Sequence, residues 1–422
     1  MSLSRISSRN YLRYLPTMSG VKRYPPKRLI VCCDGTWQDS LADAAQPPSN
    51  VTRLSRVLSR FAVVEGEDGQ QHEIPQIVYY QKGVGTNFGD KYWGGVAGLG
   101  VSANVRAAYG FLADNYSEGD KIYFFGFSRG AYTARAVAGL VCQWGLLTPR
   151  GMDNFALVYD DFYNQKIDGY SAEQRKRMGF RDPLPRFTVE IIGVWDTVGF
   201  QKAWLGRDSG EKLELRNTVL HENVRCAFHA LSLDEERTTF QPIVWHIPHK
   251  NEGQELLQVW FSGVHTDVGG GDQNPRLSNI TLAWMLAQCM KHGQLSFDID
   301  YYLFDDPPLA EESEMTPWAT SLGKVNHWSI SRTLQGMLGG TSTRRPMGYN
   351  PVGHESDITN EFIHESVRDR DLAKWRCAAL KGRHDEKSWD LPSGKQISEV
   401  TALQMEKYMK GRIRTVHVNE ED

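Results

Sequence analysis

The sequence has no long apolar run and no excess of charge of either sign. A membrane-spanning helix needs roughly 18 or more consecutive apolar residues, whereas runs such as residues 191–195 (IIGVW) are far shorter. The formal net charge is −3, from 48 Lys and Arg against 51 Asp and Glu, so the basic face that nucleic acid requires is missing. We expect a soluble protein with no transmembrane segment and no nucleic-acid partner, and its oligomeric state stays open.

Cysteine is also scarce. The 422 residues contain six cysteines and no CxxC pair, which argues against a zinc ribbon, a redox centre and a disulfide scaffold. This usage fits a reducing compartment, and we expect a cytoplasmic protein. The first 28 residues carry several basic residues and no acidic one. We interpret residues 1–26 as a flexible basic arm, with mitochondrial import through this arm as the minor alternative.

Short apolar runs alternate with helical patterns along the remaining chain. The runs end in turns and lie at residues 28–33, 76–81, 121–125, 188–194 and 256–261. Continuous rather than alternating apolar runs indicate strands that are buried on both faces. Helical periodicity occupies residues 50–61, 104–115, 131–144 and 277–292. This alternation predicts an α/β fold with a mostly parallel, doubly wound sheet.

No internal repeat and no linker divides this part of the sequence, so we expect residues 27–422 to form a single domain. Two stretches, at about 150–187 and 300–360, do not fit the alternation of strands and helices. Loops of that length inside a compact domain are either functional lids or helices whose pattern is not recognised. We expect them to be insertions over the carboxyl edge of the sheet.

A G-x-S-x-G motif at residues 126–130 marks a candidate nucleophile, Ser128. It directly follows the strand at 121–125 and directly precedes the helix at 131–144. Flanking glycines permit the strained, crowded strand-to-helix turn that presents a catalytic serine. The helix N-terminus also stabilises negative charge that develops nearby. The alternative is a tight turn with an idle serine.

A serine hydroxyl becomes a nucleophile only when a base takes its proton and an acid orients that base. His265 is the candidate base, because it follows the strand at 256–261 and precedes the glycine run 269–271. Asp196 ends the strand at 188–194 and gives the chain order serine, acid, histidine. Asp267 is the second candidate acid, although its closeness to His265 favours a local turn contact.

Acyl transfer also requires two backbone N–H donors for the oxyanion. Arg129, directly after the serine, is expected to supply one, and the loop after the first strand, with Gly35 or Thr36, the other. Asp34 precedes these two residues in that loop. It either braces the loop by accepting backbone hydrogen bonds or acts directly, and both interpretations stay open.

Four blocks of the sequence together resemble one known family. They are CCDGTW at 32–37, GFSRGAYTAR at 126–135, GVWDTVG at 193–199 and GVHTDVGGG at 263–271. They resemble the catalytic domain of the first class of type VI secretion phospholipase effectors, in its stand-alone fungal form, over roughly residues 27–300. The resemblance implies an α/β-hydrolase with the triad Ser128, Asp196 and His265. A further block, HALSLDEER at 229–237, also resembles the family, and we interpret it as buried charge pairing.

We therefore predict a serine hydrolase that cleaves a carboxylic ester of a lipid or another small acyl ester through an acyl-enzyme, without cofactor or metal. Bacterial members carry additional membrane-binding modules that we do not find here, so the choice between phospholipid and another ester stays open. One alternative is a non-catalytic binding protein on the same fold. Another is a metal-dependent hydrolase that would use Asp34, Asp196, His265, Asp267 and Asp272.

The two insertions are rich in aromatic residues, among them Phe155, Tyr159, Phe162, Tyr163, Trp318 and Trp328. A lipase-like site needs apolar surface near its nucleophile, because each buried CH₂ of an acyl chain contributes about 0.8 kcal/mol. We expect the insertions to cover an acyl pocket. The alternative is that these aromatic residues only pack the insertions onto the sheet.

Overall fold

The computed structural model describes most of the chain between residues 26 and 406. The described residues are 26–35, 47–65, 69–83, 96–164, 170–199, 218–248, 252–272, 275–292, 295–298, 341–349, 358–368, 377–383, 385, 387–404 and 406. The predicted basic arm therefore lies almost entirely outside them. No helix in these ranges is long and apolar enough to cross a membrane.

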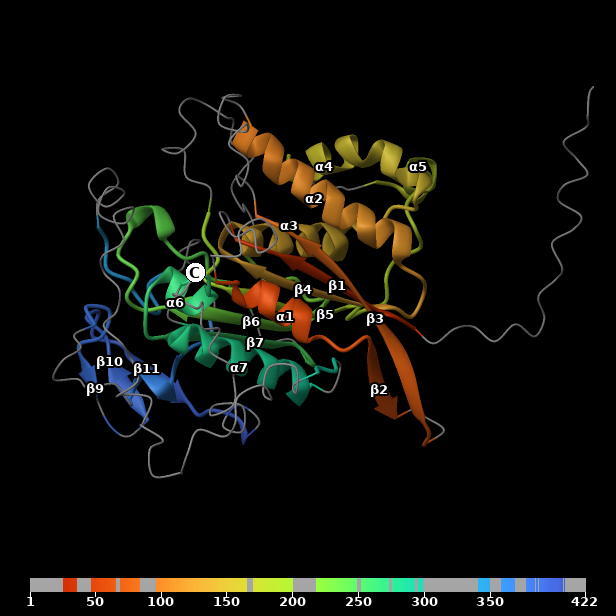
Figure 1. Cartoon of the computed structure of the whole chain (residues 1–422). Coiled ribbons are helices and arrows are strands. Elements are labelled where there is room, and N and C mark those ends of the chain that lie inside the picture. Colours follow the sequence, from red (N-terminus) through yellow and green to blue (C-terminus); the bar gives the residue numbers. More distant parts are fainter. Residues whose placement is uncertain are drawn as a thin grey trace, which may run out of the picture.

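The described strands form one sheet of 11 strands in the order β2-β3-β1-β4-β5-β6-β7-β8-β11-β10-β9 (Figure 1). All neighbouring pairs from β3 through β11 are parallel. Antiparallel pairs occur at the two ends, where β2 joins β3, and β10 joins both β11 and β9. The strands are β1 Arg28–Cys33, β2 Phe61–Glu65, β3 Gln71–Gln81, β4 Lys121–Phe127, β5 Val189–Trp195, β6 Val224–Ser232, β7 Glu255–Phe261, β8 Glu361–His364, β9 Gly382–Arg383, β10 Ser388–Asp390 and β11 Gln396–Val400.

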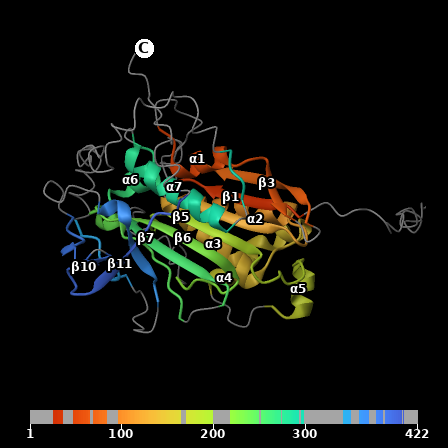
Figure 2. The same cartoon turned by 90° about the horizontal axis from the view of Figure 1, so that it is seen from below.

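Helices cover both faces of the sheet. The α-helices are α1 Asn50–Val57, α2 Val96–Asn115, α3 Ser128–Trp144, α4 Phe155–Tyr163, α5 Ala172–Met178, α6 His265–Gly269 and α7 Arg276–Lys291. Alternate residues of β1 belong to different cores: Leu29 and Val31 pack with α2 and α3, whereas Ile30 and Cys32 pack with α1 and α7. Figures 1 and 2 show the two helical layers on opposite sides of the strands. The predicted doubly wound α/β fold is confirmed.

One central strand, β6, was missing from the sequence prediction. Its residues are nearly all buried, yet Arg225, His229 and Ser232 interrupt the apolar pattern. These polar side chains find partners inside the protein: Arg225 forms an ion pair with Glu190, and His229 accepts a hydrogen bond from the amide of Thr197 (3.0 Å). A strand whose polar residues are paired internally leaves no clear apolar run in the sequence.

The first expected insertion, 150–187, does not lie over the carboxyl edge of the sheet. Its described part packs at the C-terminal ends of α2 and α3. Its described residues include α4 and α5, and its arginines cap the C-terminal ends of two helices. Arg175 donates to the carbonyl of Trp144 at the end of α3 (2.8 Å), and Arg181 donates to the carbonyl of Ala113 near the end of α2 (2.8 Å). Because α3 begins at Ser128, its other end is about 24 Å away. The expectation that this stretch covers an acyl pocket at Ser128 is therefore wrong for its described part.

The aromatic residues of that stretch pack onto the helices, which was the alternative interpretation. The ring of Phe162 packs edge-on against Trp144, with 6.4 Å between the ring centroids, and Phe155 lies 5.2 Å from Tyr109. In the second stretch, 300–360, the structure describes residues 341–349 and 358–360. Trp318 and Trp328 lie outside the described residues.

A buried asparagine at the start of α1 fixes the position of the loop that carries α6. The Nδ2 of Asn50 lies 3.1 Å from the carbonyl oxygen of Val268, 2.8 Å from that of Ser278 and 3.0 Å from the Oγ1 of Thr281. Its Oδ1 accepts a hydrogen bond from Arg53 over 3.1 Å. The side chain thus connects α1 with both α6 and α7.

We predict that Asn50→Ala lowers the free energy of unfolding by about 1–3 kcal/mol, because a buried group that donates and accepts hydrogen bonds is lost. Urea denaturation followed by circular dichroism measures the change. Arg56→Ala, on the exposed side of the same helix, should stay within about 0.5 kcal/mol of the unmodified protein. Equal stability of Asn50→Ala and the unmodified protein would contradict this role.

Candidate active site

Ser128 occupies a strained turn between β4 and α3. Its φ is +57°, in the left-handed region that non-glycine residues rarely adopt. Neither flanking glycine, Gly126 or Gly130, has room for a side chain. A Cβ on Gly130 would lie 2.2 Å from the carbonyl oxygen of Cys33, and one on Gly126 would lie 2.6 Å from the Cα of Ala131. The G-x-S-x-G pattern therefore reflects the close packing of the first turn of α3 against the end of β1.

The three residues predicted as a triad meet at the carboxyl ends of their strands. The Oγ of Ser128 lies 2.8 Å from the Nε2 of His265, and the Nδ1 of His265 lies 2.7 Å from the Oδ2 of Asp196. Asp196 directly follows β5, and His265 begins α6 shortly after β7. All three residues are buried. This arrangement can move one proton from the serine hydroxyl to the imidazole.

The carboxylate of Asp196 has two further partners beside His265. The buried Arg344 donates from Nη2 to Oδ2 over 2.9 Å. Ser232, the last residue of β6, donates from its amide to Oδ1 (3.2 Å) and from its hydroxyl to Oδ2 (3.0 Å). Burial alone would raise the pKa of Asp196, but Arg344 and His265 hold that pKa well below its usual range. The carboxylate therefore stays ionised at neutral pH.

The imidazole of His265 lies between two aromatic rings and is kept neutral by burial. The rings of Phe127 and Phe240 each lie 4.7 Å from it, measured between ring centroids. Burial lowers the pKa of His265 below its ordinary value, although the neighbouring Asp196 opposes the shift. A neutral imidazole can accept a proton from Ser128, which is what a general base must do.

The block at 229–237 supports the histidine from a second side. Glu235 is buried and accepts hydrogen bonds from the Nε and Nη2 of Arg237, both over 2.8 Å, and from the amide of His265 over 3.3 Å. Burial alone would raise the pKa of Glu235, but Arg237 lowers it to about 2. The guanidinium of Arg237 also stacks on the ring of Phe240, 3.6 Å from its centroid. The buried charge pairing expected for this block is present.

The loop after β1 lies against the strand-to-helix turn that carries Ser128 (the elbow) and is fixed by Asp34. The carboxylate of Asp34 accepts hydrogen bonds from the hydroxyls of Ser49 (2.7 Å), Thr52 (2.7 Å) and Tyr80 (2.6 Å). It also accepts one from the amide of Gly35 (2.7 Å). Of the two interpretations left open for Asp34, the structure supports bracing of the loop.

The same contact bears on the expected oxyanion donors. Gly35 lies next to the nucleophile, since a Cβ built on it would be 3.4 Å from the Cβ of Ser128. Its N–H, however, is donated to Asp34 and does not face the serine. Thr36 lies outside the described residues. The amide of Arg129 belongs to the first turn of α3, directly after the nucleophile.

Three of the four carboxylates proposed for a metal site, those of Asp34, Asp196 and Asp267, are engaged separately. Asp34 braces its loop, and Asp196 binds His265, Ser232 and Arg344. Asp267 accepts a hydrogen bond from the amide of Val264 over 2.9 Å and so caps the short helix α6. This is the local turn contact expected for Asp267. Among the described residues these groups do not form a cluster of three metal ligands.

Two partners of the acid, Ser232 and Arg344, were missing from the sequence prediction. Ser232 lies inside the block at 229–237. The resemblance of this block to the family indicated that the segment matters, but nothing in the sequence indicated the contact of Ser232 with Asp196. Arg344 is 148 positions away from Asp196 along the chain. Its segment contains two adjacent arginines, Arg344 and Arg345, and nothing in the sequence shows which one is buried.

A comparison with protein families agrees with this geometry. The model of the family described as "T6SS, Phospholipase effector Tle1-like, catalytic domain" matches residues 27–288. The chain belongs to this family. The resemblance expected from the four sequence blocks is thereby confirmed, and the fold is of the α/β-hydrolase type. Arg344 lies beyond the matched residues of this Tle1-like domain.

Individual relatives are more distant. The uncharacterized protein YEL023C of Saccharomyces cerevisiae is 28% identical over 242 residues, covering 51% of this chain and 32% of the yeast protein. An uncharacterized protein from Pseudomonas aeruginosa has a TM-score of 0.38 at 18% identity, covering 64% of this chain and 47% of its own. The Tle1 effector bound to the VgrG spike has a TM-score of 0.31 at 21% identity, covering 59% and 51%. This Tle1-like chain thus matches about a third of the yeast protein and about half of each structure.

We predict that Gly130→Ala destabilises the protein by about 3 kcal/mol or more, because its Cβ would overlap the backbone of β1. Thermal and urea unfolding measure the effect. Gly382→Ala is the matched control, since a Cβ there meets nothing within 4 Å. A Gly130→Ala protein as stable as Gly382→Ala would show that the elbow is less tightly packed than described.

Proposed function

We propose that this chain is a serine hydrolase that cleaves the carboxylic ester of a lipid or related acyl ester through a covalent acyl-enzyme. The observation that carries the proposal is the continuous chain of contacts from Ser128 through His265 to Asp196, at 2.8 and 2.7 Å. Membership in a family named for phospholipase effectors supports an ester substrate with a lipid acyl group.

In this mechanism the Oγ of Ser128 attacks the ester carbonyl while the Nε2 of His265 takes its proton. Asp196 orients the imidazole and stabilises the imidazolium that forms. The amide of Arg129 at the N-terminus of α3 stabilises the oxyanion. His265 then donates its proton to the leaving alcohol, and water, activated by the same histidine, releases the acid.

The positions of Arg344 and Ser232 suggest how the acid is kept in place. Asp196 is fully buried, and a buried carboxylate is costly unless it is paired and hydrogen-bonded. Arg344 supplies the opposite charge, and Ser232 supplies two hydrogen bonds. Both are positioning residues, because they contact Asp196 rather than the reacting atoms.

We predict that Ser128→Ala lowers kcat for a soluble acyl ester by about 10³-fold or more, because the nucleophile is lost. The same variant should no longer be labelled by a fluorophosphonate. Ser398→Ala, on the exposed side of β11, should retain both activity and labelling. Labelling of Ser128→Ala at another serine would contradict the assignment, and unlabelled, inactive unmodified protein would favour a non-catalytic role.

The pH dependence of ester hydrolysis should show that His265 is uncharged at neutral pH. Because burial lowers its pKa, activity is present at neutral pH and is lost only as the pH falls below the ordinary histidine value of about 6.5. Arg344→Met removes the cation beside Asp196, so the uncompensated carboxylate favours the imidazolium. In the plot of kcat against pH, we predict that this variant moves the fall in activity on the acid side (the acid limb) to higher pH. We also predict that it lowers the maximal kcat by about 10²-fold.

The adjacent, exposed Arg345 gives the matched control. Arg345→Met should leave both the acid limb and kcat unchanged, and Arg344→Lys should recover part of the loss. A merely structural role of Arg344 would lower the amount of folded enzyme without moving the pH profile. An unshifted profile in folded Arg344→Met would therefore contradict the positioning role.

A further inference from the structure

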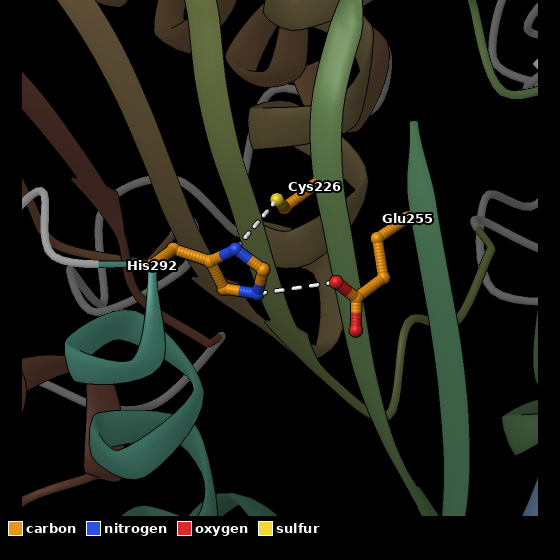
Figure 3. A group of neighbouring side chains, drawn as sticks. All are labelled: Cys226, Glu255 and His292. Atoms are coloured by element: carbon orange, nitrogen blue, oxygen red, sulfur yellow. Dashed lines mark hydrogen bonds and ion pairs between the residues drawn. The ribbon is translucent and has the colours of Figure 1, made fainter. Parts of the chain in front are cut away.

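A second group of titratable side chains lies at the amino edge of the sheet, away from Ser128. Cys226 near the start of β6 and Glu255 at the start of β7 are paired in the parallel register, so their side chains share one face. His292 directly follows α7, which covers that face. Figure 3 shows the three side chains pointing toward one another from these three elements.

The distances within this group are short. The Sγ of Cys226 lies 3.5 Å from the Nδ1 of His292, and the Nε2 of His292 lies 3.3 Å from the Oε2 of Glu255. One ligand atom from each residue can be chosen so that all three lie within 4.8 Å of one another. Among the described residues, no other three His, Cys, Asp or Glu side chains bring their ligand atoms this close together.

These separations approach those of ligands around a tetrahedral zinc ion. Zinc bonds of about 2.3 Å to sulfur and 2.0–2.2 Å to nitrogen and oxygen place neighbouring ligand atoms about 3.3–3.6 Å apart. The Cys226–His292 pair already has this separation. Glu255 faces the other ring nitrogen, and its side chain is 33% exposed, so binding of the ion would turn one carboxylate oxygen toward the sulfur and the Nδ1. Lys291 holds the Oε1 of Glu255 over 3.1 Å, which leaves Oε2 toward the ring.

The cluster is poorly satisfied by hydrogen bonds alone. The Nε2 of His292 is buried and has no hydrogen-bond partner of acceptable geometry in the described part of the chain, although the carboxylate is close. Burial lowers the pKa of His292, so its ring is neutral and offers a lone pair. Burial raises the pKa of Cys226 to about 12, so a bound metal would have to displace the thiol proton.

We propose that Cys226, Glu255 and His292 form a binding site for one zinc ion, with water as the fourth ligand. A thiolate, an imidazole and a carboxylate are the ligand types that zinc accepts. The sequence analysis assigned no metal to these residues, and Cys226 and His292, which are 66 positions apart, match no spacing motif. Folding, through the β6–β7 register and the end of α7, brings them together.

The site is separate from the proposed catalytic residues. Ser232, a partner of Asp196, follows Cys226 by six positions along β6, which corresponds to about 20 Å. An ion at this position would connect β6, β7 and α7 and stabilise the folded state, because it binds the native form preferentially. The proposal does not depend on the hydrolase assignment.

Cobalt(II) substitution of the full-length, reduced and chelator-treated protein tests the site. Thiolate ligation of cobalt gives a sulfur-to-metal charge-transfer absorption in the near ultraviolet that histidine and carboxylate ligands do not give. We expect this absorption to saturate at one equivalent of cobalt and to disappear when zinc is added. Zinc should also raise the melting temperature of the unmodified protein.

Variants distinguish this site from other cysteines. Cys226→Ser should lose the absorption, whereas Cys142→Ser, at a half-buried cysteine of α3, should keep it. His292→Gln and Glu255→Gln should each weaken cobalt binding by about tenfold or more, and the partly exposed Glu255 should tolerate the change without unfolding. No thiolate absorption in the unmodified protein, or equal absorption in Cys226→Ser, would overturn the proposal.

Discussion

The carboxylate of Asp196 is the group on which the arrangement of the site depends. It is fully buried and is contacted by side chains from three other parts of the chain: His265 at the start of α6, Ser232 at the end of β6, and Arg344. A buried charge needs such partners, because the cost of removing it from water is otherwise several kcal/mol. The position of this one charge therefore fixes the end of β5, the end of β6 and the segment at 341–349 relative to His265.

A second buried carboxylate has the corresponding role on the other side of Ser128. Asp34 connects the end of β1 with α1 and β3 through the hydroxyls of Ser49, Thr52 and Tyr80. Because Gly130 packs directly on the carbonyl groups of Cys33 and Asp34, this network also sets the position of the elbow. The nucleophile thus lies between two loops, and each loop is held by an aspartate.

The sequence was sufficient for the parts of this site that follow from strand order. Ser128 and Asp196 come directly after a buried strand and His265 shortly after one, and the carboxyl ends of parallel strands meet at one edge. Arg344 could not be found this way, because it lies 148 residues from its partner and does not directly follow a strand in the described part of the chain. The first insertion was misplaced because hydrogen bonds from Arg175 and Arg181 to helix ends determine its position, and surface arginines are too common to signal this.

The central claim, that Ser128 forms a covalent acyl-enzyme, is tested most directly by trapping that intermediate. The unmodified protein would be mixed with an activated acyl ester, quenched in acid during turnover, digested and analysed by mass spectrometry. The account predicts that the mass of the acyl group appears on the peptide that contains Ser128, at that residue. Steady turnover with no acyl group on Ser128, or an acyl group on a different residue, would contradict it.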